Sequence, residues 1–163
     1  MKKTLSYIGL ILILILGLTS CVKKEDENYA NQTKANTVIT EINQLPTTDA
    51  IELTDEVKVA NVRSLYNALS KEAKALVTNL DKLEALENKL IELKKAKDNQ
   101  DKANVVIELI NKLPAADELT LEGEDKVKEA RTSYEALSEE VKALVTNLSK
   151  IEALENKLIE LKK

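Results

Sequence analysis

Apolar residues recur along most of the chain at steps of three and four, with polar and charged residues between them. This spacing places apolar side chains on one face of an α-helix, so it predicts amphipathic helices rather than strands. The start of the chain is different, because Ile8 to Leu18 forms a single apolar run. The sequence therefore predicts a short apolar N-terminal segment followed by a long helical region.

The helical region is duplicated. At an offset of 68 residues, residues 35–95 align without a gap with residues 103–163, and 39 of the 61 positions are identical. Such self-similarity indicates a tandem repeat. A polar tether at residues 21–34 precedes the first copy, and a charged junction at residues 96–102 separates the two copies.

Each copy carries the apolar stripes of three helices. The first is ended by Pro46 or Pro114, because the residue before a proline is disfavoured in the helical conformation. A loop of about nine residues follows, and then the second helix. The expected core positions are Val38, Ile42 and Leu45 with Val59, Val62, Tyr66 and Leu69 and with Leu83, Leu86, Leu90 and Leu93; in copy two they are Val106, Ile110 and Leu113 with Val127, Ala130, Tyr134 and Leu137 and with Ile151, Leu154, Leu158 and Leu161.

Polar residues before two of these segments resemble helix caps. Ser70 and Ser138 are predicted N-caps of a short helical turn. Asp81 and Ser149 each stand three residues before a glutamate, which predicts a capping box at the start of the third helix.

Three amphipathic helices with short connections bury their stripes most simply as an antiparallel bundle. We therefore predict an all-α fold with two tandem three-helix bundles, each marginally stable alone because it has about 60 residues. No glycine or proline interrupts the path from Leu83 to Leu113. The third helix of copy one can thus continue into the first helix of copy two, which would join the bundles into a rod.

The N-terminal segment indicates export. Two lysines precede the apolar run, as in a signal peptide, and the run is too short for the roughly 20 residues that a membrane-spanning helix needs. Leu18-Thr19-Ser20-Cys21 follows and resembles the lipobox of bacterial lipoproteins. That resemblance implies removal of residues 1–20 and acylation of Cys21, which anchors the chain to the extracytoplasmic face of the cell membrane. The alternative is an ordinary signal peptide followed by an incidental cysteine.

Composition excludes several classes of function. Residues 21–163 contain 22 Lys and Arg residues and 28 Asp and Glu residues. Their net charge of −6 argues against nucleic-acid binding. A single glycine remains, Gly123, so no glycine-rich phosphate loop is present. The chain has no histidine and no cysteine beyond Cys21, which disfavours catalysis and zinc binding. We expect no enzyme, no cofactor and no small-molecule substrate.

Two patterns are candidate sites. Arg63 with Tyr66, and Arg131 with Tyr134, lie three residues apart and share a helix face, where they form either a recognition edge or a packed tyrosine beside an arginine paired with a carboxylate. Residues 118–129 place Gly123 sixth and Glu129 twelfth, as in a calcium-binding EF-hand loop. Thr120, Glu122 and Asp125 depart from that pattern, and solvated ion pairs such as Glu124 with Lys128 are the simpler interpretation.

Copy two has Leu113-Pro114-Ala115-Ala116-Asp117-Glu118-Leu119-Thr120-Leu121 and later Lys142-Ala143-Leu144-Val145-Thr146-Asn147-Leu148. With Arg131 and Tyr134, it resembles helical repeats in multimodular surface proteins of low-GC Gram-positive bacteria and Mollicutes. The resemblance implies a structural spacer or a protein-interaction module. A solute-binding lipoprotein of a transport system is the alternative.

Overall fold

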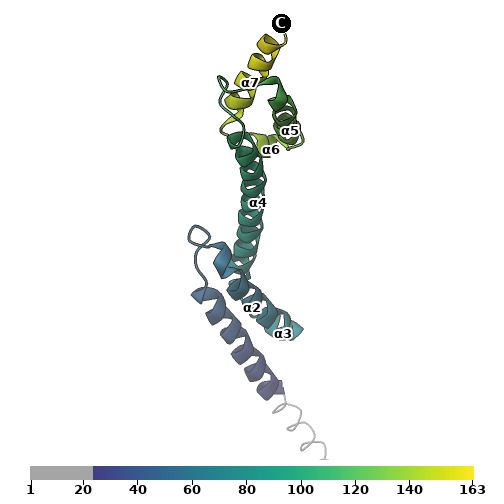
Figure 1. Ribbon diagram of the computed structural model, residues 1–163. Coiled ribbons are helices and arrows are strands. Elements are labelled where there is room, and N and C mark those ends of the chain that lie inside the picture. Colours follow the sequence, from purple (N-terminus) through teal and green to yellow (C-terminus); the bar gives the residue numbers. More distant parts are fainter. Residues whose placement is uncertain (1–23) are drawn as a thin grey trace, which may run out of the picture. The chain divides into compact units, whose positions relative to one another are not determined.

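The structure is a computed structural model that describes residues 24–163 (Figure 1). The predicted signal peptide and Cys21 lie outside the described residues. Within them the chain is helical and contains no strand, which confirms the all-α class. A first helix covers residues 24–44. The later elements are η1 Leu53–Asp55, α2 Glu56–Asn67, α3 Lys71–Lys74, α4 Leu80–Asn111, η2 Leu121–Gly123, α5 Glu124–Glu135, α6 Glu139–Lys142 and α7 Leu148–Leu161.

The chain divides into two compact units, Met1–Ile91 and Glu92–Lys163, and each has its own core. In the second unit, side chains of α4, α5, α6, α7 and the connecting loops meet in one buried cluster: Ala103, Val106, Ile110, Leu113, Leu119, Val127, Ala130, Val141, Val145, Ile151, Leu154 and Leu158. In the first unit the corresponding buried residues are Ala35, Val38, Ile42, Leu45, Ile51, Val59, Val62, Ala73, Leu83, Leu86 and Leu90. The same sequence pattern thus produces the same kind of core twice.

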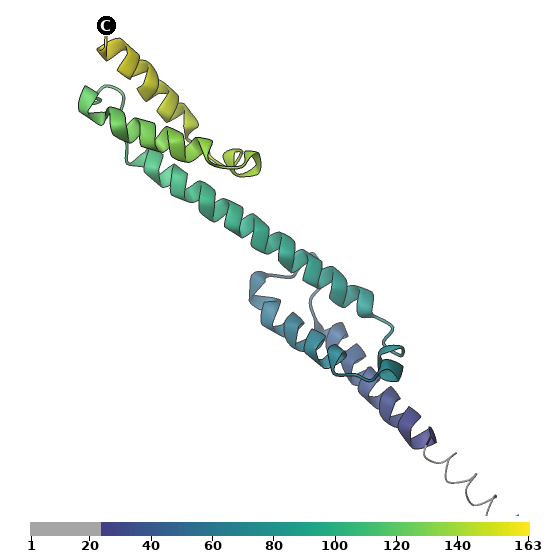
Figure 2. The ribbon, with the colours of Figure 1, turned by 90° about the vertical axis from the view of Figure 1, so that its right-hand side faces the viewer.

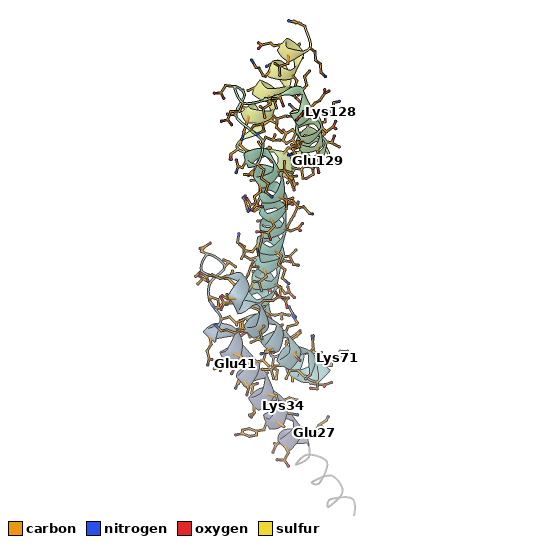
Figure 3. All side chains as sticks on the ribbon, viewed as in Figure 1. Glu27, Lys34, Glu41, Lys71, Lys128 and Glu129 are labelled. Atoms are coloured by element: carbon orange, nitrogen blue, oxygen red, sulfur yellow. The ribbon has the colours of Figure 1, made fainter. Side chains whose placement is uncertain are left out.

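The first helix begins earlier than the sequence analysis expected. The sequence predicts a polar tether at residues 21–34, but residues 24–34 are helical and continue without a break to residue 44. The Ser70 hydroxyl donates a hydrogen bond to Asn31 Oδ1 at 2.9 Å, so part of this extension contacts the rest of the unit. Glu27, Lys34 and Glu41 lie along this helix (Figure 3). The helix ends just before Pro46, as the proline predicts.

Helix α4 runs from Leu80 to Asn111 without interruption (Figure 2). It contains the third helix of copy one, the junction and the first helix of copy two. The predicted continuity across residues 96–102 is confirmed. The arrangement of two bundles in series as a rod stays a prediction.

The predicted capping boxes are wrong. Asp81 and Ser149 lie inside the first turns of α4 and α7, because those helices already begin at Leu80 and Leu148. Asn147 is the residue that precedes α7, and its side chain makes no cap hydrogen bond. For the short helices α3 and α6, the predicted N-cap residues Ser70 and Ser138 do directly precede the helix. Ser70 caps α3 by accepting from the Ala73 amide at 3.1 Å, whereas Ser138 precedes α6 but its hydroxyl accepts no cap hydrogen bond.

Two further differences concern the core. Leu161 was expected inside, but its position in the last turn of α7 leaves it 39% exposed. Ile51 and Leu119 lie in the loops before η1 and η2 and are buried at 6% and 4% exposure, although no periodic pattern identified them. Each loop therefore contributes an apolar side chain to its core.

Among the described residues, no helix is both long enough and apolar enough to span a membrane.

Candidate functional site

Each unit contains a charged cluster that is built from the second and third helices. Arg63 of α2 donates from Nε and Nη2 to the two carboxylate oxygens of Glu87 on α4, at 2.6 and 2.5 Å. Arg131 of α5 makes the same fork to Glu155 of α7, at 2.7 and 2.6 Å. Two parallel charge-assisted bonds fix the orientation of both groups. The cluster therefore joins the second helix of each unit to its third helix.

A tyrosine and a lysine complete each cluster. The Tyr66 ring centroid lies 5.4 Å from Arg63 Cζ and 5.6 Å from Lys74 Nζ. In the second unit the Tyr134 centroid lies 5.9 Å from Arg131 Cζ and 5.8 Å from Lys142 Nζ. Cations within about 6 Å of an aromatic ring are attracted to its face. Each half-buried tyrosine ring thus lies close to two basic side chains.

These contacts favour the packing interpretation of the arginine and tyrosine pairs. The pairing of Arg63 and Arg131 with carboxylates is confirmed, and both arginines are half-buried rather than free on the surface. The Glu87 hydrogen bonds raise the pKa of Arg63, and those of Glu155 raise the pKa of Arg131. Because each guanidinium is bound to a carboxylate on the third helix of its unit, the arginine of each cluster stabilises the helix packing.

A second set of contacts joins the third helix to the first. Asn79 Nδ2 donates to the Ile39 carbonyl at 3.0 Å and to Asn43 Oδ1 at 2.9 Å. Lys82 Nζ donates to the carbonyls of Asn43 and Leu45 at 3.2 and 2.7 Å. The last carbonyls of a helix have no partner within that helix, so a lysine placed there satisfies them.

The second unit repeats these contacts. Asn147 donates to the Ile107 carbonyl and to Asn111 Oδ1, while Lys150 donates to the carbonyls of Asn111 and Leu113. No local pattern in the sequence predicts this role of asparagine and lysine. One signal in the sequence is available. Asn147 and Lys150 of the second copy have identical counterparts, Asn79 and Lys82, in the first copy.

Glu124, at the start of α5, binds two lysines. Its Oε1 lies 2.7 Å from Lys128 Nζ, which confirms the predicted pair, and 2.6 Å from Lys162 Nζ of α7. The hydrogen bond from Lys128, followed by that from Lys162, lowers the pKa of Glu124 to about 2. The carboxylate therefore links the two helices in its charged form.

We expect this link to weaken in acid. The lowered pKa means that the Glu124 contribution to stability is present above the unfolded-state value near 4.5 and is lost as the pH falls toward 2. Glu124→Gln should therefore lower the urea midpoint at pH 6, and the difference from wild type should shrink between pH 4.5 and 2. Circular dichroism at a series of pH values would measure it. A difference that stays constant with pH would show that Glu124 does not act through its charge.

The acidic segment at residues 118–129 is not arranged as a calcium loop. Gly123 ends η2 with helical angles, φ −81° and ψ −6°, and Glu129 follows Lys128 on α5, where Figure 3 labels both residues. Glu124 is already bound by two lysines. Among the described residues, no group of three or more His, Cys, Asp or Glu side chains is placed to hold a metal ion.

The second unit also has a groove between α5 and α7, with a volume of about 420 Å³. Val127, Leu158 and Ile159 supply its apolar part. Its charged residues pair with one another, because Glu124 binds Lys128 and Lys162 and Arg131 binds Glu155. The groove offers apolar contact and few polar groups for recognition.

Comparison with protein-family models, with curated proteins and with solved structures gave no match. The candidate anchor, Cys21, lies outside the described residues.

Proposed function

We propose that the chain is a lipid-anchored cell-surface protein whose helical units act as a structural spacer or as a protein-interaction module. The observation that carries the proposal is Leu18-Thr19-Ser20-Cys21 directly after a short apolar run. The lipid on Cys21 holds the protein on the extracytoplasmic face of the cell membrane. Two or more acyl chains are needed for stable attachment, because a single chain binds only marginally.

The non-catalytic part of the proposal is supported by the charged clusters. In both units the arginine, tyrosine and lysine side chains that most resemble a site are engaged in packing the helices. A duplicated unit whose polar clusters serve its own fold suits a spacer or a surface that contacts another protein. No cofactor and no nucleic acid enter this function.

Lipid attachment is tested by metabolic labelling of the full chain with a tagged fatty acid. Cys21→Ala should abolish labelling and leave an uncleaved precursor, because the thiol that receives the lipid is absent. Ser20→Ala is the matched control, since it keeps a small residue before the cysteine and should label normally. Labelling of the Cys21→Ala protein would refute the anchor.

The choice between spacer and interaction module is tested by affinity capture with the mature chain on intact cells and extracellular material. A saturable protein partner whose binding is competed by the unlabelled chain would favour the interaction module. Absence of saturable binding at high protein concentration would favour the spacer.

The alternative is a small solute-binding lipoprotein of a transport system. The groove between α5 and α7 favours it, because its volume of about 420 Å³ falls in the usual range for small-molecule sites. A ligand in this groove would raise the melting temperature by mass action. A thermal shift across a metabolite panel that is lost in Ile159→Lys would support this alternative.

A further inference from the structure

The middle of α4 differs from both of its ends. Buried residues along this helix stop at Leu90 and resume at Ala103. Between them, residues 96–102 are exposed on every side except for the half-buried Asn99. Most helical stability in proteins comes from packing an apolar face rather than from intrinsic propensity. This stretch of α4 has no such face.

The composition of residues 96–102 does not replace the missing core. Asp98, Asn99 and Asp101 are poor helix formers, because their side chains compete for nearby backbone groups. Poor propensity is tolerated at either end of α4, where a core holds the helix. In residues 96–102, where no core packs against the helix, poor helix propensity favours local unfolding of α4.

Surface contacts hold this stretch together. Lys97 pairs with Asp101 at 2.9 Å, Lys102 pairs with Asp98 at 2.6 Å, and Gln100 donates to Asn104 at 2.9 Å. All three join residues four apart, the spacing at which helical side chains meet. The pair of Lys97 with Asp101 has the less favourable order, with the base nearer the N-terminus of the helix.

One further contact ties this region to α6. Glu140 accepts from Lys95 at 2.8 Å and from Asn99 at 3.4 Å. The side chains of Lys95 and Glu140 are 65% and 63% exposed, so solvent and salt screen this pair as well. The side-chain contacts described here that support residues 95–104 are therefore all polar, and their ion pairs are exposed to solvent.

We propose that residues 96–102 form a joint in α4 that is held by ion pairs and opens by local unfolding while the cores of both units stay folded. Its opening is set by ionic strength, because salt weakens the pairs of Lys97 and Lys102 but not the buried apolar contacts at Leu86 and Ile110. The joint is a property of the helix and does not depend on the proposed lipid anchor.

Hydrogen exchange of the full mature chain tests the proposal, with each rate referred to an unfolded peptide in the same salt. Amides of residues 97–103 should exchange at least about tenfold faster than those of residues 83–90 and 106–110, as expected for local opening. Raising the salt from about 0.05 to 0.5 M should speed exchange in the joint roughly two- to fivefold, given the strength of two such pairs. The flanking amides should not respond.

Two variants separate the ion pairs from intrinsic propensity. Lys97→Gln with Lys102→Gln keeps good helix formers but removes both pairs, so at low salt it should exchange nearly as fast as wild type does at high salt. It should keep only the smaller salt response that the pair of Lys95 with Glu140 supplies. Asp98→Glu with Asp101→Glu keeps the charges, improves propensity and should slow exchange. Equal protection along all of α4, or an unchanged salt response in the glutamine variant, would overturn the proposal.

Discussion

Leu154→Ala is expected to lower the free energy of unfolding of the second unit by about 3 kcal/mol, within the usual range for a fully buried leucine. Leu154 lies on α7, is 0% exposed and belongs to the cluster that joins α4, α5 and α7. Its truncation removes apolar contacts and leaves a cavity that the surrounding helices cannot fill. Because a unit of this size is only marginally stable, the loss should leave a large fraction of it unfolded.

The measurement is hydrogen exchange of the α7 amides together with a urea titration. Ile159→Ala is the control on the same helix, since Ile159 is 57% exposed and its truncation should change stability by less than about 0.5 kcal/mol. Leu86→Ala removes the equivalent side chain of the first unit and should leave α7 exchange unchanged. Equal effects of Leu154→Ala and Ile159→Ala would contradict the core described above.

Leu119→Ala is expected to destabilise the second unit by about 2 to 4 kcal/mol, although this residue lies in a loop. Leu119 is 4% exposed and packs beside Gly123, where an added Cβ would lie 2.8 Å from Leu119 Cδ1. The glycine leaves room for the leucine, so the loop closes over the end of the core. Without the Leu119 side chain, the loop no longer covers the end of the core.

Leu121→Ala supplies a matched control two residues away. Leu121 is 49% exposed, so its truncation should have little effect on the urea midpoint. Gly123→Ala tests the proposed contact from the other side, because the new methyl group must displace Leu119 and should lower stability as well. If Leu121→Ala were as harmful as Leu119→Ala, the burial assigned to this loop would be wrong.

The candidate site was only partly predictable. The spacing of Arg131 and Tyr134 correctly placed them on one face and indicated a carboxylate partner. That partner, Glu155, lies 24 residues away on another helix, and many other carboxylates of similar spacing compete with it in the sequence. The choice depends on how α5 packs against α7. The same limit applies to Asn147 and Lys150, whose acceptors lie on the first helix of the unit or just after its end.

The capping boxes failed for a related reason. Asp81 and Ser149 have the right residues at the right spacing, but spacing alone does not decide where a helix begins. Asn79 and Asn147 turn their amides toward the first helix, and the third helix starts two residues earlier than the pattern indicates. Tertiary hydrogen bonds therefore decide this helix boundary against a plausible local signal.

By itself the sequence determined the all-α class, the duplication and most core positions, because a helix places residues three and four apart on one face whatever surrounds it. Ile42, Leu86 and Ile151 follow directly from that periodicity, and the continuity of α4 follows from the absence of glycine and proline. Only the tertiary structure decided which loop leucine is buried, which carboxylate each arginine binds and where α4 lacks a core. Those features depend on which elements lie against one another, and no local pattern of residues specifies that.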